Sequence, residues 1–279
     1  MRVLVVGTGY IGSKFAEYAR GWDSEESFRK NDCAKVGAES GLSFHIEMVS
    51  SREKWKNTPF EDFDSIIFAA GVAHRKQTKK NAHEYFEVNR DLAIEVAKKA
   101  MAAKVPHFVY ISSMAIFGKK QGEISSHTIP APANNDYYGT SKQDAEEALI
   151  NLQNAGFSVA IVRPPMVYGE GCPGKYSTLA KIAKLTPVVF CNKNKRSVIY
   201  IDNLSEFLCK IICKCKAGFF HPQNDDYVST SQLIAEIRQQ CGKKTRIVSA
   251  PGIMRLCMAV CPPVKNAFGT LYYSGGDGE

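Results

Sequence analysis

Short apolar runs alternate with amphipathic stretches along the first 165 residues of the chain. An unbroken apolar run is typical of a strand that is buried on both faces of a parallel sheet. Apolar positions that recur three and four residues apart, as between Leu92 and Ala100, indicate a helix with one buried face. The alternation therefore predicts an α/β protein built on a Rossmann-type, doubly wound parallel sheet.

The predicted elements follow one another regularly up to about residue 165. We expect strands at 2–6, 43–49, 65–70, 108–111 and 157–162. We expect helices at 11–20 and 85–104, and a third helix that carries Tyr138. The polar stretch 21–42 is predicted to be a long connection or a ragged helix, and 118–132 is predicted to be a loop.

Beyond residue 165 the regular alternation breaks down into shorter, mixed elements. These are expected at 177–185, 188–190, 196–202, 203–214 and 229–240. The tail, 251–279, contains several Pro and Gly residues, and we expect it to be loosely ordered. The chain is therefore divided into a Rossmann unit, 1–165, and a smaller lobe, 166–279, which is interleaved with the last strands of the sheet.

A glycine-rich turn, Gly7-Thr8-Gly9-Tyr10-Ile11-Gly12, joins the first strand to the first helix. Its glycines allow a tight turn, close approach of the backbone to a pyrophosphate, and packing of the helix on the strand. The phosphates would lie at the helix N-terminus, where free amide groups attract anions. The motif predicts a site for NAD or NADP that uses Gly7, Gly9, Tyr10, Ile11 and Gly12.

The end of the second strand bears on the choice between the two cofactors. An acidic residue at this point would bind the ribose hydroxyls of NAD, whereas small polar residues and an arginine accept the 2′-phosphate of NADP. Here the strand ends in Ser50 and Ser51, and Arg52 follows. This pattern favours NADP, but Glu47 lies three residues back and Arg52 is equally typical of an ordinary surface, so the cofactor stays open between NAD and NADP.

Two further strands end in residues that suit a ligand. The third strand runs through Ala69 and Ala70 into Gly71, and such small residues let the backbone pass close to a cofactor. The fourth ends in Ser112 and Ser113, at the sheet edge where open α/β folds bind their ligands. A serine that merely caps a helix is the competing interpretation.

Tyr138 and Lys142 are one helical turn apart, so their side chains leave the same face of the predicted helix. An ammonium beside a phenol favours the phenolate and lowers the pKa of the tyrosine. The pair is thus a candidate acid/base group. The alternative is a solvated helix face that happens to carry both residues.

Composition narrows the range of functions. The 279 residues include 36 Lys and Arg against 28 Asp and Glu, a net charge of +8, which suits an anionic ligand such as a nucleotide. No block of five or six like charges marks a nucleic-acid arm, and no apolar run is long enough to span a membrane. The nine cysteines show no zinc-binding spacing, and the chain begins without the pattern of a secretion signal. We therefore expect a cytoplasmic protein with no metal, no nucleic acid and no membrane partner.

Five motifs occur in an order that resembles the extended short-chain dehydrogenase/reductases, the NAD-dependent epimerase/dehydratase family that acts on nucleotide sugars. Roughly residues 1–245 take part in the resemblance. The motifs are Gly7-x-Gly9-x-x-Gly12, Ser112 to Gly118, Tyr138-x-x-x-Lys142, Arg163 to Gly169 and Arg196 to Asp202. Within the family the chain is most similar to bacterial 4-epimerases and 4-keto reductases of surface polysaccharide synthesis.

The resemblance implies a role for individual residues. Tyr138 would be the acid/base on the sugar hydroxyl, Ser113 would hydrogen-bond the same oxygen, and Lys142 would lower the tyrosine pKa and bind the nicotinamide ribose. Further family positions are Asn89, Pro164 and Pro165 beside the cofactor, and Met166 and Arg196 beside the substrate, with Arg196 on its pyrophosphate. The family also implies a homodimer, and Met166 stands where many members carry Asn.

Three reactions share this set of residues. A 4,6-dehydratase of the family carries two carboxylates directly after the serine, and here Met114 and Ala115 occupy those places. We therefore expect a UDP-hexose 4-epimerase, similar to UDP-glucose 4-epimerase. The alternative is an NADPH-dependent reductase of a nucleotide 4-keto-6-deoxy sugar. A non-catalytic NAD(P)-binding sensor is a third possibility on this fold, but it would be marked by loss of the Ser113, Tyr138 and Lys142 set.

Overall fold

The computed structural model describes residues 1–22, 43–52 and 54–275 of the chain. Its larger lobe is built on a six-stranded sheet with the order β10-β6-β4-β3-β1-β2, in which every neighbouring pair is parallel. The strands are β1 (Arg2–Val6), β2 (His45–Val49), β3 (Ser65–Phe68), β4 (His107–Ile111), β6 (Ser158–Val162) and β10 (Gly218–Phe220). The predicted doubly wound parallel sheet is confirmed. The predicted connection 21–42 lies mostly outside the described residues.

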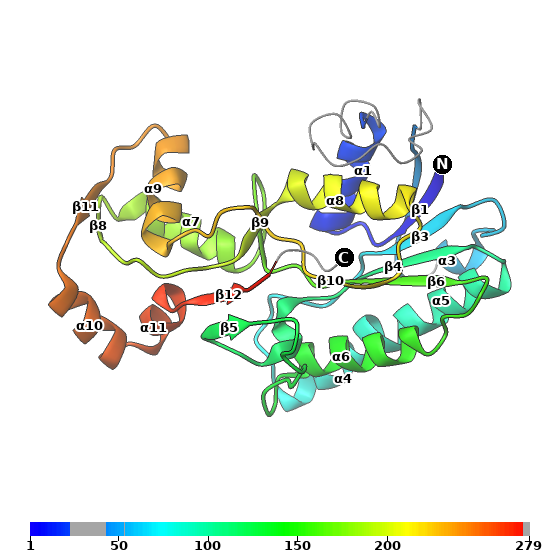
Figure 1. Cartoon of the computed structure of the whole chain (residues 1–279), viewed down its shortest axis with the longest axis horizontal. Coiled ribbons are helices and arrows are strands. Elements are labelled where there is room, and N and C mark those ends of the chain that lie inside the picture. The colour runs from blue at the N-terminus through cyan, green and yellow to red at the C-terminus, as the bar shows by residue number, and fades with distance from the viewer. Residues whose placement is uncertain (23–42, 53, 276–279) are drawn as a thin grey trace.

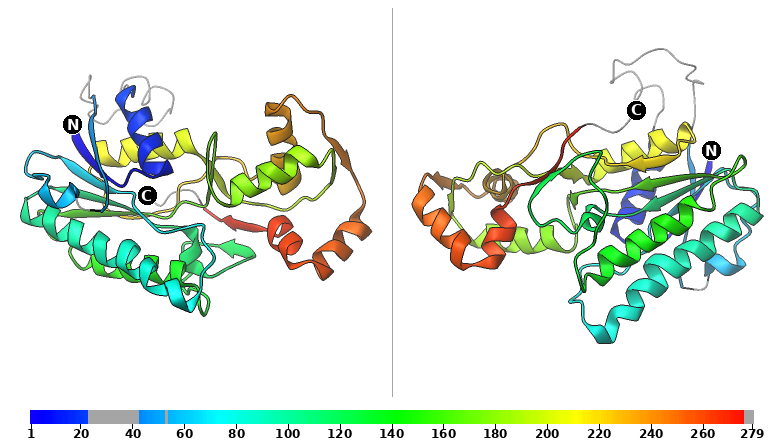
Figure 2. Two further views of the ribbon diagram at one scale, coloured as in Figure 1. Left: turned by 180° about the vertical axis from the view of Figure 1, so that it is seen from behind. Right: turned by 60° about the horizontal axis from the view of Figure 1, so that its bottom comes forward.

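Helices cover both faces of this sheet, as Figures 1 and 2 show. Alternation along β1 decides which side chains meet which helices, because successive strand residues point to opposite faces. Val3 and Val5 pack in one apolar cluster with Phe15, while Leu4 and Val6 belong to a second cluster on the other face. The first face is covered by α1 (Tyr10–Arg20) and α8 (Ile201–Cys213), and the second by α5 (Leu92–Ala102) and α6 (Tyr137–Ile150).

The smaller lobe lies beyond the carboxyl edge of the sheet and contains short elements (Figure 1). Three two-stranded parallel sheets, β8–β11, β7–β9 and β5–β12, replace the continuous sheet. Their strands are β5 (Gly122–Ile124), β7 (Met166–Tyr168), β8 (Val188–Phe190), β9 (Val198–Tyr200), β11 (Arg246–Val248) and β12 (Leu271–Tyr273). The helices are α7 (Lys175–Leu185), α9 (Thr230–Gln240), α10 (Pro251–Val260) and α11 (Pro262–Phe268).

The structure confirms the helix expected at 85–104 and corrects the connection expected at 118–132. The helical run is continuous from Ala82 to Ala102 and consists of α4 (Ala82–Phe86), a π-helical turn (Glu87–Asp91) and α5. The expected connection 118–132 contains β5. A short helix, α3 (Lys54–Asn57), also precedes β3. None of these short features carries a periodic signal in the sequence.

The expectation of a loosely ordered tail is wrong for residues 251–275. This segment forms α10, α11 and β12, and β12 pairs with β5. Tyr273 is 2% exposed, packs with Ile116 and Phe117, and donates its hydroxyl to the carbonyl oxygen of Arg163 at 2.9 Å. Apolar burial and a new strand pairing thus order the tail.

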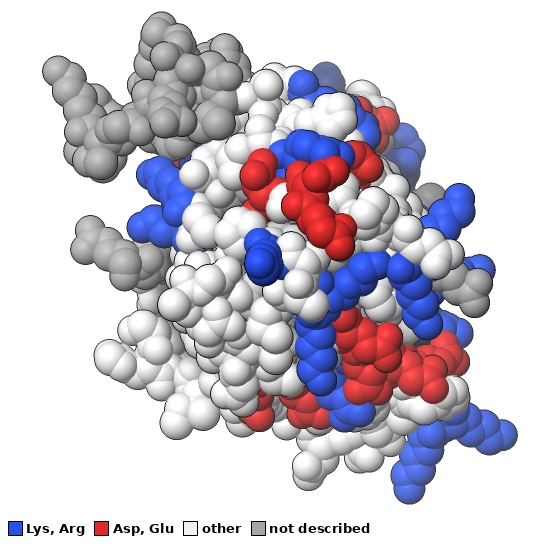
Figure 3. Space-filling view, turned by 90° about the vertical axis from the view of Figure 1, so that its right-hand side faces the viewer, with Lys and Arg blue, Asp and Glu red and all other residues white. Residues whose placement is uncertain are grey.

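Charged side chains of both signs lie beside one another at the large-lobe end of the molecule (Figure 3). Among the charged residues of the large lobe, Arg2 pairs with Glu47 and Asp62, and Lys14 pairs with Glu17. This is a solvated, mixed surface. Across the part of the chain that the structure describes, no helix has the length and apolarity needed to cross a membrane.

Candidate active site

The glycine turn has the geometry of a phosphate cradle. Gly7 has φ +121°, and a Cβ there would lie 2.5 Å from the backbone nitrogen of Ala70, so only glycine fits. A Cβ on Gly12 would lie 2.3 Å from the carbonyl oxygen of Gly7, so helix and turn pack closely. Gly9, by contrast, faces open space, and no side chain caps the N-terminus of α1 behind it. The helix therefore presents uncapped amide groups that suit a bound pyrophosphate.

Tyr10 and Ile11 lie in the first turn of α1. The Tyr10 hydroxyl donates to the carbonyl oxygen of Glu170 at 3.0 Å, and burial raises the pKa of the Tyr10 phenol. Ile11 packs against the apolar cluster under α1. Tyr10 thus links the glycine turn to the segment that follows β7.

The end of β2 lies next to the glycine turn, because Val49 pairs with Val6 and its carbonyl accepts a 2.9 Å bond from the Gly7 amide. Ser50 accepts a bond from the Arg52 amide at 3.3 Å, and Arg52 is exposed. Both residues therefore occupy the edge at which a Rossmann fold distinguishes NAD from NADP.

The N-terminus of α6 is fixed by two side chains. Asp136 caps the helix by accepting from the Gly139 amide at 3.1 Å, and Gln77 accepts from the Tyr138 amide at 3.0 Å. Gln77 in turn donates to Asp136 at 3.0 Å. These bonds fix the first turn of α6, and with it the position of the Tyr138 backbone.

Ser113 lies at the carboxyl end of β4, close to the helix that carries Tyr138. Its hydroxyl oxygen caps a short 3₁₀ helix by accepting from the Ala115 amide at 3.1 Å. That short helix packs on the first turn of α6, where a Cβ on Gly139 would lie 3.2 Å from the Ala115 carbonyl oxygen. The capping interpretation of Ser113 is confirmed. Burial raises the pKa of the Tyr138 phenol, and the Ser113 side chain opposes that rise. The sequence-based expectation that Lys142 lowers this pKa is not met in this structure.

The reason is the direction of the lysine side chain. Lys142 is 3% exposed, and its ammonium donates to the carbonyl oxygen of Ile111 at 2.8 Å and lies 4.6 Å from the ring centroid of Tyr110. Burial lowers the pKa of Lys142 to about 7, and the charge of Glu146 opposes this shift. The lysine also faces Gly71, where a Cβ would lie 3.5 Å from its ammonium nitrogen.

Glu146 and Arg163 form a buried ion pair that was not identified from the sequence. The Glu146 and Arg163 side chains are 3% and 9% exposed, with a shortest N–O distance of 2.6 Å, and the Ser112 hydroxyl donates to the same carboxylate. Glu146 lies one turn after Lys142 on α6, as Lys142 lies one turn after Tyr138. That spacing was a usable signal, because it predicts three ionisable side chains on one helix face. The negative charge of Glu146 favours the protonated form of Lys142, so Glu146 acts on the site through the lysine.

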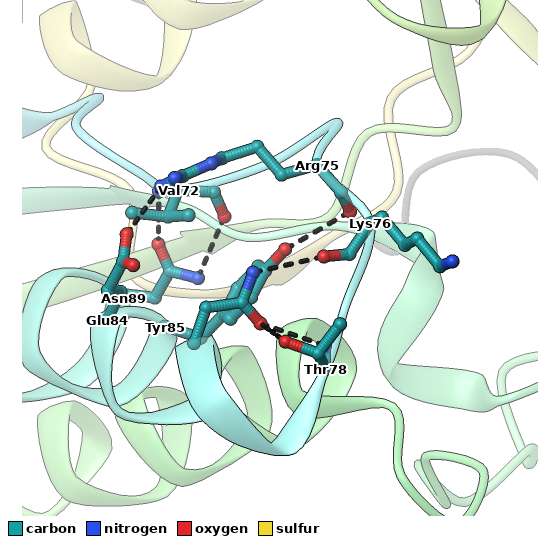
Figure 4. Close-up of polar contacts among 8 residues, drawn as sticks. Val72, Arg75, Lys76, Thr78, Glu84, Tyr85 and Asn89 are labelled. Atoms are coloured by element: carbon teal, nitrogen blue, oxygen red, sulfur yellow. Dashed lines mark hydrogen bonds and ion pairs between the residues drawn. The ribbon is translucent and has the colours of Figure 1, made fainter.

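Asn89 lies in the π-helical turn and is fully buried. Its side-chain amide makes two bonds to the backbone of Val72, at 2.8 and 3.2 Å (Figure 4). It donates a third bond to the Ser141 hydroxyl of α6 at 3.0 Å. The Tyr110 hydroxyl also donates to the Asn89 carbonyl oxygen at 2.6 Å. Asn89 therefore ties the segment after Gly71 to the helix of Tyr138, and π-helical turns frequently occur at such functional points.

The rest of that segment is held against α4 in the same way (Figure 4). Arg75 pairs with Glu84, and the Tyr85 hydroxyl donates to the Arg75 carbonyl oxygen at 3.2 Å. The Tyr85 ring also packs edge-on against Tyr138, with the centroids 6.5 Å apart. This wall of the site is thus pinned at several points before any ligand binds.

The segment after β6 brings the next predicted residues to the same edge. Pro164 and Pro165 are buried, and the Pro164 carbonyl accepts from the Met114 amide at 3.0 Å, which joins this segment to the Ser113 turn. Met166 begins β7 and packs against the apolar cluster of the smaller lobe.

Arg196 lies apart from this group. Its guanidinium donates from one nitrogen to the carbonyl oxygens of Asn266, Ala267 and Gly269, at 3.1, 3.4 and 2.9 Å. These carbonyls lie at the C-terminus of α11, where backbone acceptors lack helical partners. In this structure Arg196 therefore anchors the tail, and burial lowers its pKa.

The structure thus brings Ser113, Tyr138, Lys142, Gly71 and Asn89 together at the carboxyl edge of β3 and β4. The glycine turn and the residues Ala69 and Ala70 lie along the same edge, at the ends of β1 and β3. The uncapped helix, the space at Gly9 and a phenol one helical turn from a buried lysine fit a dinucleotide and proton transfer to or from a hydroxyl.

Comparison with known proteins agrees with this geometry. A family model, the NAD dependent epimerase/dehydratase family, matches residues 3–223. A UDP-glucose 4-epimerase of Vibrio cholerae is 26% identical over 89% of this chain and 78% of its own length. The chain spans 60% and 62% of the length of the next two curated relatives.

Two solved structures have a similar fold. One is a dTDP-4-dehydrorhamnose reductase from Bacillus anthracis in complex with NADP, with a TM-score of 0.66 and 20% identity over 90% of this chain and 85% of that one. The other is a UDP-glucuronic acid 4-epimerase from Bacillus cereus in complex with NAD, with a TM-score of 0.66 and 16% identity over 98% of this chain and 88% of that one.

Proposed function

Since the chain belongs to the NAD dependent epimerase/dehydratase family, an NAD(P)-dependent group of enzymes, we propose that it is a nucleotide-sugar 4-epimerase that acts on a UDP-hexose. The observation that carries the proposal is the packing of the Ser113 turn on the first turn of α6, which carries Tyr138 one helical turn before buried Lys142. Residues 1–165 would hold the cofactor and the acid/base group, and residues 166–279 would supply most substrate contacts. The 26% identical UDP-glucose 4-epimerase favours this reaction over others of the family.

The geometry of the site supports a definite division of labour. Tyr138 accepts the proton of the sugar C4 hydroxyl, and Ser113 donates a hydrogen bond to that oxygen. A bound nicotinamide supplies the acceptor, and later the donor, of the C4 hydride. The 4-keto sugar then rotates in the site, so that C4 receives the hydride on its other face. Tyr138 returns the proton to the C4 oxygen, and the C4 configuration is inverted. The net reaction consumes no cofactor.

Lys142 and its partner shape this proton transfer. Burial lowers the pKa of Lys142 to about 7, and its ammonium, which donates to the Ile111 carbonyl in the structure, would have to face the phenol to stabilise the phenolate. Glu146 favours the protonated form of Lys142. Uncapped amides of α1 and the glycine turn would bind the cofactor pyrophosphate, and Asn89 and Pro164 would hold the walls beside the nicotinamide.

The direct test is to incubate the purified protein with a panel of UDP-hexoses and NAD⁺, without an external reductant, and to follow the H1 and H4 signals by proton NMR. We expect the C4 epimer to appear while total sugar stays constant. If no UDP-hexose changes and a 4-keto sugar nucleotide consumes NADPH instead, the epimerase proposal is overturned.

The second candidate is therefore an NADPH-dependent reductase of a nucleotide 4-keto-6-deoxy sugar. It is favoured by Ser50 and exposed Arg52 at the end of β2, which suit a 2′-phosphate. The variant Arg52→Ala should weaken NADP binding by about tenfold and leave NAD binding unchanged, because only the phosphate contact is lost. Fluorescence titration with both cofactors measures this, and Lys54→Ala, next to the tip, is the control. Equal losses for NAD and NADP would remove the support for NADP.

We also propose that the active protein is a cytoplasmic homodimer. Light scattering on the purified protein tests the oligomer, and a monomer with full activity would contradict it.

A further inference from the structure

Charge is distributed very unevenly between the two ends of the molecule. Residues 171–196 and 237–275 contain twelve Lys and Arg and no Asp or Glu, whereas the rest of the chain contains 24 Lys and Arg against 28 Asp and Glu. The two segments form α7, β8, β11, α10, α11 and β12 in the smaller lobe. We call this part of the lobe the basic end. Nine of its basic side chains are exposed: Lys181, Lys184, Lys193, Lys195, Lys243, Lys244, Arg246, Arg255 and Lys265.

The same end holds most of the exposed apolar side chains. Ten large hydrophobic residues are exposed in the part of the chain that the structure describes, and seven of them belong to the basic end. They are Ile182, Leu185, Val188, Ile247, Ile253, Leu256 and Val260. Single exposed hydrophobic residues are ordinary on a protein surface, but a concentration of them marks an interaction site.

Helix α10 is the clearest part of this surface. Ile253, Leu256 and Val260 are 53%, 64% and 71% exposed and recur at helical spacing, so they form one stripe along the helix. Met254 is buried, whereas most of this largely apolar helix is not. The helix lies at the outer end of the smaller lobe in both Figures 1 and 2. A helix this apolar normally packs against a partner.

We propose that the basic end docks on the surface of a membrane that contains anionic phospholipids. Apolar side chains of α10 enter the boundary between headgroups and acyl chains, and the surrounding lysines and arginines bind the lipid phosphates. The binding is peripheral, because the described helices are too short to cross a bilayer. This proposal replaces the sequence-based expectation of no membrane partner.

Other occupants fit the surface less well. A second copy bound through the same face would bring the nine exposed positive charges against nine more, because a two-fold interface pairs a surface with itself. Nucleic acid would pair with the lysines but would leave the aliphatic stripe of α10 without a contact. Proteins bind nucleic acid through its phosphates and by stacking aromatic rings on its bases. An anionic bilayer satisfies both the charge and the apolar stripe.

Flotation of the full-length protein with large unilamellar vesicles tests the proposal. Vesicles of about 40% phosphatidylglycerol and about 60% phosphatidylcholine are compared with vesicles of pure phosphatidylcholine. Each comparison is made at salt concentrations below and above the physiological value. We expect binding to the anionic vesicles, weakened by salt, and little binding to the neutral ones.

Two sets of variants separate the two parts of the surface. Leu256→Ser with Ile253→Ser should reduce partitioning by about tenfold, because apolar burial is lost. Lys243→Glu with Lys244→Glu should reduce it by at least about tenfold, since each basic residue near an anionic surface contributes roughly fivefold. The matched controls lie in the large lobe: Ile129→Ser, which replaces a residue that is 80% exposed, and Lys79→Glu with Lys80→Glu. These controls should bind as the unaltered protein does.

Circular dichroism of each variant in solution checks that the fold survives. Equal binding to neutral and anionic vesicles, no binding to either, or equal loss in the controls would each overturn the proposal. A change of molecular mass by light scattering on Leu256→Ser would overturn it too, in favour of a second copy. If the protein bound no vesicles but bound a defined acidic protein through these residues, the proposal would be overturned and the surface would be assigned to that protein.

Discussion

The two lobes satisfy their buried and half-buried cations in different ways. In the large lobe, Arg163 pairs with the Glu146 carboxylate, whose charge also favours the protonated form of Lys142. In the smaller lobe, Arg196 and Arg238 donate to backbone carbonyls at the C-termini of α11 and α7. Carbonyl oxygens satisfy the donors without neutralising the charge. The large lobe thus balances its charge internally beside the acid/base site, whereas the smaller lobe keeps a positive charge that can attract anions from outside.

The largest expected effect concerns chemistry in the large lobe alone. Tyr138→Phe removes the proton acceptor, and we expect turnover to fall by about 10²–10⁴-fold while cofactor affinity stays nearly unchanged. NMR-monitored turnover and cofactor titration measure the two quantities. Tyr137→Phe, on the neighbouring residue, is the control and should stay active. Full activity of the Tyr138 variant would end the proposed mechanism.

The internal charge balance is tested by Glu146→Gln. The change leaves Arg163 buried beside a neutral partner, so the free energy of unfolding should fall by about 3 kcal/mol. Because the carboxylate raises the pKa of Lys142, its loss should lower that pKa further and shift the pH profile of turnover towards acid.

Urea unfolding and a pH–rate profile provide the readouts for this variant. Exposed Glu147, the next residue, supplies the control: Glu147→Gln should change stability by less than about 0.5 kcal/mol. A stable variant with an unmoved pH profile would show that Glu146 does not act on Lys142.

Arg238→Met tests the other side of the comparison. Arg238 donates to the carbonyl oxygens of Ala183, Lys184 and Lys244, at distances from 2.8 to 3.3 Å, and is 5% exposed. Its loss leaves these acceptors without partners and should cost about 2 kcal/mol.

Hydrogen exchange should show the loss of protection for Arg238→Met in α7 and α9 but not in the six-stranded sheet. Arg246→Met, at an exposed arginine of the same lobe, should have little effect. Equal loss of protection in the sheet would mean that the two lobes unfold as one unit.

The smallest effect is a pH dependence that belongs to the large lobe. His107 is 1% exposed, bonds Ser65 and the Lys216 carbonyl, and has a pKa lowered by burial. Below about pH 6.5 the unfolded chain therefore binds more protons than the folded one, and stability falls as the pH is lowered.

Urea unfolding at neutral and mildly acid pH should show this fall, and His107→Gln should reduce its slope by roughly 1 kcal/mol or less over that range. His83→Gln, at an exposed histidine, should keep the slope. An unchanged slope in the His107 variant would assign the acid sensitivity to other groups, among them His221, whose pKa burial lowers to about 4.

Local patterns were sufficient for much of the site. The glycine spacing placed the uncapped N-terminus of α1, and the helical spacing placed Tyr138 and Lys142 on one face of α6. The turn after β4 placed Ser113. Each of these depends on the conformation of a few consecutive residues, which the sequence encodes directly.

Other parts of the site depend on contacts between distant segments. The direction of the Lys142 side chain follows from the Ile111 carbonyl, 31 residues away. The burial of Glu146 follows from Arg163, and the use of Arg196 follows from the carbonyls at the end of α11. No local periodicity reports which of several possible partners a side chain meets.

The amino-acid sequence by itself determined the parallel sheet, the glycine turn and the spacing of the acid/base pair, because burial periodicity and backbone conformation are local properties. The tertiary structure alone decided the order of the strands, the seating of β12 on β5, the balance of charge around Lys142 and the exposure of α10. These features depend on which distant surfaces exclude water from one another, and that is settled only when the whole chain packs.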